Sequence, residues 1–354
     1  MPPTESLIVE TAERIFADLA DPQDILKAGD GAWQAKLWNA LQDVGLTLAW
    51  APEALGGSDA PLGEGFAVIR AAGRGAIAAP LAETLLAAWL LARAGIAAPS
   101  GPMSVAPANP RDRLRLDADG RLTGKLRNTP FARAAEHLAV LADGPDGLMI
   151  ALARVADCKV TPGENLAGDP SDTVEFAAVT PLRLEKAPAG FSHEALQLMG
   201  AAVRAQQIAG ALDAMLALAV RYSMERIAFE KLISKFQAVQ HNLARLGDEV
   251  AAGVAAAVSA ADTISESGLD GEAALLEIAA AKIRCGEAAE TATLIAHQVH
   301  GAIGYTDEHV LHRFTLRALA WRDDFGNESH WSARLGGFVA EIGADRLWPL
   351  LASR

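Results

Sequence analysis

The sequence of 354 residues predicts a mainly α-helical protein with a small β domain. Three observations predict this fold class. Hydrophobic residues make up 51% of the chain and aromatic residues only 5%, and the chain is rich in alanine, which favours close-packed helices. Apolar residues recur at helical spacing towards both ends of the chain. Between them, short alternating runs flank Asp-Gly pairs, the strongest short-range signal of a β-hairpin.

Residues 1–100 are predicted to form an N-terminal helical domain. One set of apolar residues recurs at i, i+4, i+7 and i+11 and is expected on one buried helix face: Leu37, Leu41, Val44 and Leu48. The segment "APEALGGSDAP" interrupts this pattern, because its prolines and glycines end regular structure. The longest apolar run, "APLAETLLAAWLLARAGIAA", contains Glu83 and Arg93, so we expect a buried helix and not a membrane span.

Residues 101–188 are predicted to form a middle β domain. The chain enters it near "AAPSGP", where proline, glycine and serine crowd together as at a domain boundary. The segment "LRLDADGRLTGKL" places two alternating runs on either side of Asp119-Gly120, and "LAVLADGPDGLMIALARV" repeats that pattern. The segment "TVEFAAVTPLRLE" adds further strand-like residues.

Residues 189–354 are predicted to form a C-terminal helical bundle. Four apolar residues share one helix face: Val239, Leu243, Leu246 and Val250. The alanine-rich segments 201–221 and 273–297 have the same period. Several long helices joined by short links are typical of an antiparallel four-helix bundle.

Charge and cysteine content exclude several classes of function. Acidic residues outnumber basic ones by 44 to 31, so the net charge is −13, and no basic, aromatic-interleaved block appears; we therefore expect no nucleic-acid partner. The amino terminus lacks a basic start followed by an apolar stretch, so no secretory signal is expected. Two distant cysteines, Cys158 and Cys285, fit a reducing cytoplasm. We predict a cytoplasmic protein with no membrane partner.

The histidines do not form a recognisable metal motif. Imidazoles are available near the end of the bundle, at His297, His300, His309 and His312, but HEXXH is absent, so no metal is expected. The GxSxG elbow, the Walker loop and GxGxxG after a strand are also missing.

Two segments contain residue types that suit a nucleotide. In "RYSMERIAFEKLISKFQAVQ", Arg226 offers a planar fork for phosphate, and Gln237 offers donors and acceptors for a base. In "HQVHGAIGYTDEHVLHRF", Gly301 and Gly304 would let backbone amides approach a phosphate. An ordinary amphipathic helix hairpin and a glycine helix end explain the same residues, and spacing alone does not decide.

The order of helical, β and helical regions, taken together with these segments, resembles the acyl-CoA dehydrogenase family of flavoproteins over almost the whole chain. The segment "LWNALQDVGLTLAWAPEALGG" is similar to the family's early stretch that ends in a Pro-Glu and Gly-Gly loop. The other two segments are similar to its Arg-x-x-Phe-Gly…Phe-Gln and Gln-x-x-Gly-Gly-x-Gly-Tyr signatures. The resemblance implies a middle β-barrel or sandwich domain between an N-terminal helical domain and a C-terminal four-helix bundle.

The resemblance also implies a chemistry and a cofactor. In this family a glutamate removes a proton from Cα of a bound acyl-CoA while a hydride leaves Cβ for the flavin of FAD, as in β-oxidation of fatty acids or steroid side chains. One subunit covers the flavin, and its neighbour supplies residues to the diphosphate and adenosine. The matching cofactor positions here are Arg226, Phe229, Phe236, Gln237, Gln298, Gly301 and Ala302.

Departures from the family pattern concern the flavin and the base. Glu230 and Ala302 replace glycines. The stretch "MSVAPANPRD" stands where the family has Thr-Glu-Pro-x-x-Gly-Ser-Asp, and the family's tryptophan beside the flavin is replaced, with Pro130-Phe131 in its place. The family's two alternative base positions fall on Gly326 and Gly200, and neither can abstract a proton.

Three hypotheses follow from these matches and departures. In the first, the chain is the non-catalytic or half-site subunit of an α2β2 acyl-CoA dehydrogenase whose homologous partner supplies the base. In the second, it is an active homo-oligomer that binds acyl-CoA and uses Glu328 or Asp324 as an unusual base. In the third, it is a scaffold that binds neither FAD nor CoA.

Overall fold

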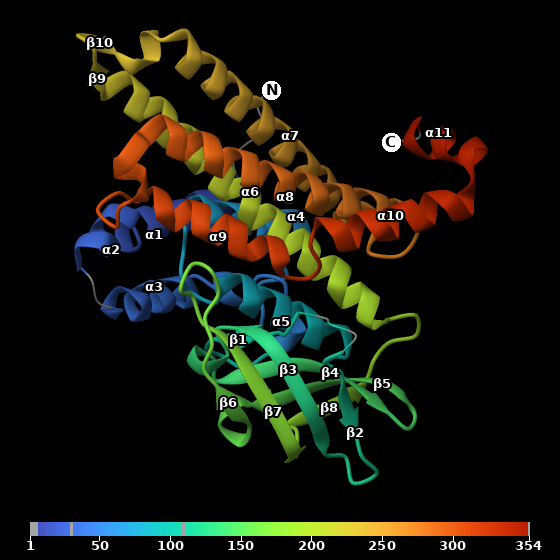
Figure 1. Cartoon of the computed structure of the whole chain (residues 1–354). Coiled ribbons are helices and arrows are strands. Elements are labelled where there is room, and N and C mark those ends of the chain that lie inside the picture. The colour runs from blue at the N-terminus through green and yellow to red at the C-terminus, as the bar shows by residue number, and fades with distance from the viewer. Residues whose placement is uncertain (1–5, 29–30, 108, 110, 353–354) are drawn as a thin grey trace.

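The computed structural model describes residues 6–352 except 29, 30, 108 and 110. Part of the amino-terminal segment examined for a secretory signal therefore lies outside the described residues. Helices form a layered body above a β domain, so the predicted fold class is confirmed (Figure 1).

Helices at the start of the chain form one side of this body: α1 (Leu7–Leu19), α2 (Pro22–Ala28), α3 (Ala32–Asp43), α4 (Leu62–Arg74) and α5 (Leu81–Arg93). Leu37 and Leu41 are fully buried on α3, as predicted. Val44 is 50% exposed, so its expected burial is wrong, because α3 ends at Asp43 and Val44 no longer follows the helical period. The apolar run that includes Glu83 forms the buried helix α5.

The β domain consists of one sheet with the strand order β6-β7-β3-β2-β4-β5-β8, and β1 pairs with β4 beside this path. Its strands are β1 (Met103–Ser104), β2 (Leu114–Leu116), β3 (Leu122–Pro130), β4 (His137–Gly144), β5 (Gly147–Arg154), β6 (Lys159–Thr161), β7 (Ser171–Val179) and β8 (Arg183–Lys186). Both predicted hairpins, β2–β3 and β4–β5, are confirmed. In the first turn, the Asp117 carboxylate accepts hydrogen bonds from the backbone of Asp119 and Arg121, and Gly120 has φ +74°.

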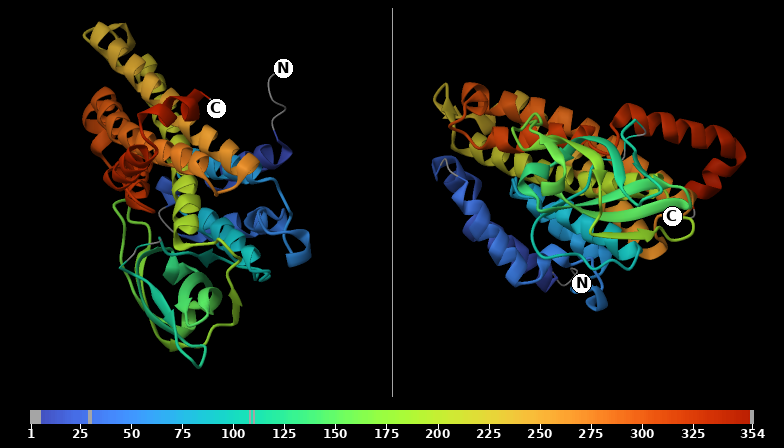
Figure 2. Two further views of the ribbon diagram at one scale, coloured as in Figure 1. Left: turned by 90° about the vertical axis from the view of Figure 1, so that its right-hand side faces the viewer. Right: turned by 90° about the horizontal axis from the view of Figure 1, so that it is seen from below.

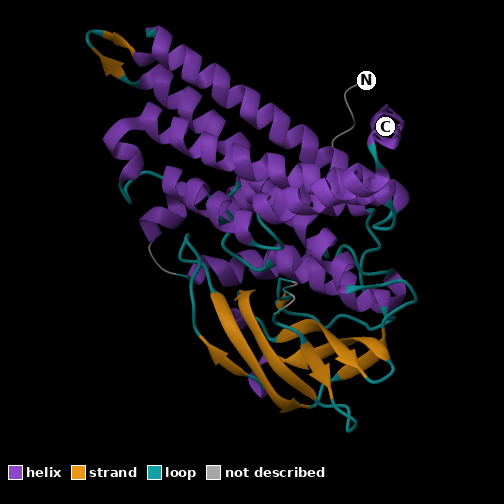
Figure 3. Cartoon of the chain, turned by 45° about the vertical axis from the view of Figure 1, so that its right-hand side comes forward, coloured by secondary structure: helices purple, strands orange, loops and turns teal. Residues whose placement is uncertain are grey.

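The rest of the chain forms the predicted bundle and its extensions (Figure 3): α6 (His193–Glu225), α7 (Gln237–Ser267), α8 (Glu272–His300), α9 (Leu311–Asp323), α10 (Glu328–Ile342) and α11 (Ala344–Ala352). Helices α10 and α11 reach away from the β domain at the carboxyl end of the chain (Figure 2). By length and composition alone α6 could cross a membrane, but 78% of its most apolar window is buried inside the bundle, as in the core helix of a folded domain.

Glycines let α4 and α6 cross with their backbones almost in contact. A Cβ on Gly73 would lie 2.2 Å from the Gln207 carbonyl oxygen, and a Cβ on Gly210 would lie 2.0 Å from that of Arg70. A glycine of each helix therefore packs directly on the backbone of the other helix, and a larger residue at either position would clash. This crossing ties the N-terminal helices to the bundle.

A two-stranded hairpin, β9 (Ile227–Ala228) and β10 (Lys231–Leu232), connects α6 to α7 and projects from one end of the bundle (Figure 1). Its two loop residues have positive φ, 51° at Phe229 and 64° at Glu230. Two consecutive residues with positive φ are the requirement of a type I′ turn, in which the second position favours glycine. Glu230 therefore sits in a strained conformation at the position where the family signature has glycine.

We predict that Glu230→Gly stabilises the hairpin by about 1 kcal/mol, because glycine reaches this φ without steric strain. The expected readout is slower hydrogen exchange of the Ile233 amide, which donates to the Arg226 carbonyl across the hairpin. The matched control is Glu225→Gly at the end of helix α6, which should be neutral or destabilising. Equal exchange rates for Glu230→Gly and the unmodified chain would show that the turn is not strained.

Candidate functional site

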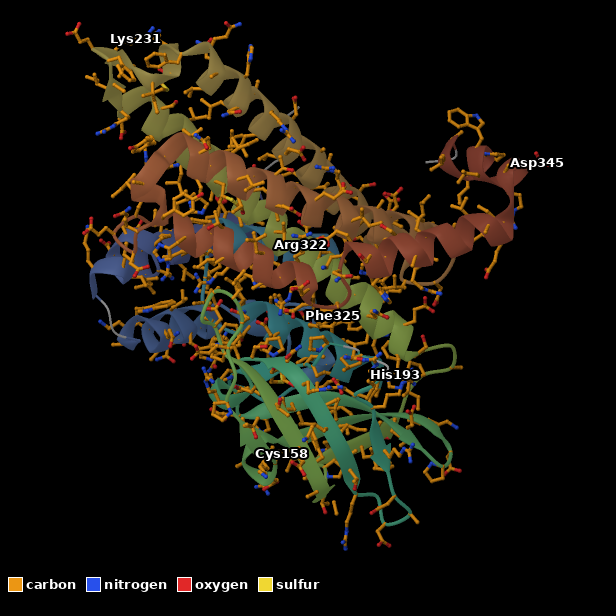
Figure 4. All side chains as sticks on the ribbon, in the orientation of Figure 1. Cys158, His193, Lys231, Arg322, Phe325 and Asp345 are labelled. Carbon is orange, nitrogen blue, oxygen red and sulfur yellow. The ribbon has the colours of Figure 1, made fainter. Side chains whose placement is uncertain are left out.

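The loop between α9 and α10 brings together the two positions predicted for the catalytic base. Gly200, in the first half of α6, faces the ring of Phe325, and a Cβ on Gly200 would lie 2.2 Å from the Phe325 Cδ1 atom. Gly326 is the next residue along the loop. In Figure 4, Phe325 lies on the side of the helical body nearest the β domain. An aromatic ring, and not a carboxylate, therefore faces Gly200, and a Cβ on Gly326 would face His330 and Trp331.

Three hydrogen bonds from side chains of α8 and α10 hold this loop. The Trp331 indole Nε1 donates to the Phe325 carbonyl (3.1 Å), and Lys282 Nζ donates to the carbonyls of Gly326 (2.8 Å) and Arg322 (2.6 Å). Lys282 is fully buried on α8, and this burial lowers the pKa of its ammonium to about 8. The lysine thus caps the carboxyl end of α9 and fixes the loop that follows it.

A buried ion network holds the loop from inside the core. Arg204 on α6 is 2% exposed; its Nη2 lies 2.8 Å from Glu83 Oε1 on α5 and 2.9 Å from Asp324 Oδ2 in the loop. Its Nε donates a second hydrogen bond, of 3.0 Å, to the same Asp324 oxygen. Burial raises the pKa of both carboxyl groups, although the guanidinium opposes that rise. Asp324, one candidate for an unusual base, is therefore engaged with Arg204.

Glu328, the other candidate, is the first residue of α10 and points towards α8. Its Oε1 accepts a hydrogen bond of 2.8 Å from Arg322 Nε, and a Cβ on Gly286 would lie only 1.6 Å from that oxygen. Arg322 also pairs with Glu290 at 3.1 Å. Glu328 is thus packed into a structural ion pair at a helix start, where the helix dipole favours a negative charge.

Three residues of this site were not predicted from the sequence: His330, Lys282 and Arg204. His330 stands beside Gly326, since a Cβ there would lie 2.6 Å from the His330 Cδ2 atom, and its Nε2 is 2.9 Å from the Gln197 side-chain amide. Burial is the main cause of the lowered pKa of His330. Lys282 and Arg204 were also missed. Isolated charges inside alanine-rich helices were the available signal for both of them.

The β domain's predicted flavin-covering stretch lies beside the start of α6, where His193 and Leu196 share one small cavity with it. Residues 105–107, 109 and 112 line a cavity of about 30 Å³, enough for one water. Positions 108 and 110 of the predicted stretch lie outside the described residues. Polar contacts join the β domain directly to the helices nearby: Arg317–Asp169 at 2.6 Å, His193–Asp143 at 3.0 Å, and the Met103 amide to the Thr84 hydroxyl at 3.0 Å.

Phe131 instead lines a second cavity of about 330 Å³, which lies between α3, the turn before α5 and the end of β3. Aromatic, proline and alanine side chains form most of its wall, together with Gln34 and Asn39. A volume in this range suits a small ligand. No described residue of its lining is charged, so it offers no basic group to a diphosphate.

The predicted cofactor residues of the bundle lie on the surface. Arg226 ends α6 and is exposed, Phe229 is 89% exposed, and Gln237 begins α7. Phe236 packs between the Phe229 ring (6.2 Å between centroids) and Lys231 Nζ (4.2 Å from its centroid). The side chains of Arg226 and Gln237 make no hydrogen bond or ion pair with any residue that the structure describes.

The second cofactor segment lies at the same end of the bundle as this hairpin. Gln298, Gly301 and Ala302, at the end of α8, are exposed. Beside them the His300 ring stacks on Tyr222 of α6, one turn before Arg226, with 4.6 Å between centroids. The structure therefore brings together the two segments that the sequence places far apart. Within the described part of the chain, no group of three or more His, Cys, Asp or Glu side chains could hold a metal ion.

Comparison with known proteins agrees with this architecture. The family model "Acyl-CoA dehydrogenase, C-terminal domain" matches residues 189–327. Acyl-CoA dehydrogenase IpdE2 of Mycobacterium tuberculosis (strain ATCC 25618 / H37Rv) is 27% identical over 324 residues, which cover 90% of this chain and 92% of that protein.

Several solved structures share this fold over nearly the full length of the chain. The ChsE4-ChsE5 complex from Mycobacterium tuberculosis contains a chain that superposes with a TM-score of 0.86, at 23% identity, covering 97% of this chain and 100% of that one. A chain of the Tcur3481-Tcur3483 steroid ACAD (G363A variant) gives a TM-score of 0.81, at 27% identity, covering 94% and 97%. Residues 189–327 thus match the C-terminal domain of acyl-CoA dehydrogenases, and the chain is similar over most of its length to members of that family of FAD-dependent oxidoreductases, which act on CH–CH bonds.

Proposed function

We propose that this chain is the half-site subunit of a hetero-oligomeric acyl-CoA dehydrogenase, in which a homologous partner chain supplies the catalytic base and covers the flavin. The observation that carries the proposal is an asymmetry within the chain. Both base positions are glycines, one against the buried Phe325 ring and the other against His330 and Trp331, whereas Arg226 and Gln237 are exposed and unpaired among the described residues. The base positions therefore lie in the buried core, whereas the nucleotide-binding residues are exposed to solvent.

The outward half suits a dinucleotide. The Arg226 guanidinium would hold the diphosphate, and Phe236 and Gln237 would contact the nucleotide on the hairpin side. At the end of α8, Gln298 and the backbone of Gly301 and Ala302 would hold the adenosine side. FAD, when bound, supplies the hydride acceptor for the Cβ–H of an acyl-CoA, while this chain's residues bind and orient it.

The chain's own inward half offers no free catalytic base. Glu328 and Asp324 are held in ion pairs with Arg322 and Arg204, so neither carboxylate is free to meet a substrate. An active homo-oligomer that uses one of these two bases would first have to break an ion pair.

The descriptions of similar proteins support a homologous partner chain and a bulky acyl-CoA substrate. Two of the similar structures are described as complexes of two chains, ChsE4-ChsE5 and Tcur3481-Tcur3483, and the second as a steroid ACAD. We infer an α2β2 assembly with a homologous dehydrogenase chain, acting in β-oxidation of a bulky acyl-CoA such as a steroid side chain. We also infer that this assembly works in the cytoplasm.

The decisive experiment is to purify the chain alone and together with a base-bearing dehydrogenase chain encoded beside it. We expect a colourless, inactive lone chain and a yellow, active complex. A lone chain that binds stoichiometric FAD and turns over acyl-CoA would contradict the half-site proposal. A complex that binds neither FAD nor CoA would support the scaffold reading instead.

In the active complex, Arg226→Ala should weaken FAD binding about 10- to 100-fold, because it removes a charge-assisted contact to the diphosphate. The measurement is FAD released on dilution, followed by flavin absorbance. Arg245→Ala, which removes an exposed arginine farther along α7, is the matched control and should leave FAD bound. Equal FAD loss from both variants would mean that Arg226 has no specific part in the site.

Glu328→Gln should leave the turnover of the complex within about twofold of the unmodified enzyme, because the Glu328 carboxylate pairs with Arg322 and takes no part in proton abstraction under the half-site proposal. Loss of a general base lowers turnover by about 10²- to 10⁴-fold. The assay is reduction of an artificial electron acceptor with a steroid side-chain acyl-CoA. A decrease of that size, with the complex still folded and yellow, would establish Glu328 as the base and refute the half-site proposal.

A further inference from the structure

We propose that His300 and His309 are positioning residues for FAD: their two neutral rings hold the loop 301–308 closed, and a proton on either ring opens it. This loop contains Gly301 and Ala302 of the proposed adenosine side. The inference rests on the proposed function, because it states what keeps that part of the half-site in place. It adds two residues to the half-site and a condition, the pH, under which the half-site releases its cofactor.

The two rings meet at the base of this loop. His300 is the last residue of α8, and His309 lies two residues before the start of α9; their ring centroids are 4.7 Å apart. On its other side the His300 ring stacks on Tyr222 of α6, four residues before Arg226. The histidine pair therefore closes the loop and connects it to the helix that leads into the projecting hairpin.

A backbone hydrogen bond fixes the His309 ring in its neutral form. The Leu311 amide donates to His309 Nδ1 (3.2 Å), so this nitrogen carries no proton. Leu311 is the first residue of α9, where an amide has no partner within the helix. A proton on Nδ1 would remove the acceptor from this helix start, because the ring would then present a donor to another donor.

The His300 ring is held neutral by the opposite tautomer. Its Nδ1 donates to the Ala296 carbonyl (2.7 Å), so the lone pair of the neutral ring is on Nε2. Nε2 is buried and has no hydrogen-bond partner in the described part of the chain, and His300 as a whole is 3% exposed. A proton on Nε2 would create a buried, charged donor without an acceptor.

The surroundings of the pair also oppose a proton. Burial is the main cause of the lowered pKa of both rings, and the pKa of His309 falls to about 4. Nearby groups that are cationic, or become so in acid, lower it further, from α6, α8 and α9 respectively: Arg221, His297 and His312. The loop's own carboxylates precede His309 and are exposed: Asp307 and Glu308.

The sign of the pH dependence follows from these states. An open loop returns the ring to its ordinary pKa of 6.5, so the closed loop is fully favoured above that pH and loses its advantage as the pH falls towards 4. For His309 alone, a fall from about pH 7.5 to about pH 5.5 shifts the equilibrium about tenfold towards the open loop. Release of FAD requires the open loop, so its rate should rise by the same factor.

The first test uses the FAD-loaded complex with the partner chain and follows flavin fluorescence after dilution. FAD should leave the unmodified complex about tenfold faster at about pH 5.5 than at about pH 7.5. In His309→Asn the two rates should agree within about twofold, because the asparagine oxygen accepts from the Leu311 amide and does not titrate. The matched control is His137→Asn at the start of β4, which should keep the tenfold difference.

The second test uses the lone chain and requires neither FAD nor a partner. Nitrogen-15 NMR of the histidine-labelled chain should show the ring proton on Nδ1 of His300 and on Nε2 of His309. Both rings should titrate below the ordinary histidine pKa of about 6.5. The His309→Asn variant identifies the His309 signals by their absence.

The inference is overturned if FAD release from the unmodified complex does not depend on pH, or if His309→Asn retains the tenfold difference. The second outcome would mean that acid acts elsewhere, for example by dissociating the complex. A ring that titrates at or above the ordinary pKa, or that has the other tautomer, also overturns it. Failure of the half-site proposal would show separately, as a complex without FAD at any pH or a lone chain that turns over acyl-CoA, neither of which depends on the NMR titration.

Discussion

The Arg204 guanidinium is the group on which the architecture around the site depends. It is buried in the helical core, and it bonds to Glu83 in the N-terminal helices and to Asp324 in the C-terminal loop. A buried charge is tolerated only when it is paired, and removing one partner of such a pair typically destabilises a protein by about 3–5 kcal/mol. Helices α5 and α6 and the loop that ends α9 are therefore held in one arrangement.

That arrangement sets the conformation of the loop after α9, and with it the basis of the half-site proposal. Because Asp324 is drawn inward to Arg204, the next residue, Phe325, enters the core and Gly326 reaches Lys282. The projecting hairpin between α6 and α7 remains outside this network, and its exposed Phe229 and Arg226, which pairs with no residue that the structure describes, lie away from the core.

Much of the fold follows from local sequence patterns, whereas the site depends on contacts that those patterns do not contain. Alanine-rich helical spacing and the Asp119-Gly120 turn predicted the helices and a hairpin, because both are short-range signals. Val44 was misplaced because the apolar spacing was continued past Gly45, whose left-handed φ of 75° marks the end of α3. Gly200 and Gly326 were located by register with family motifs, but the contact between Gly200 and the Phe325 ring depends on the packing of segments more than a hundred residues apart. The roles of Arg204 and Lys282 were hidden for the same reason, because a charge in a helix does not reveal its partner.

The buried network also imposes an order on biosynthesis. Glu83 and Arg204 leave the ribosome well before Asp324, so during translation the arginine has only one of its two carboxylate partners. The helical core can be completed only when the loop after α9 has been made and has closed over α6. A chain interrupted before that loop would leave the buried Nε of Arg204 without its acceptor on Asp324. The nascent protein should therefore depend on its carboxyl-terminal segment, or on chaperones, until synthesis is finished.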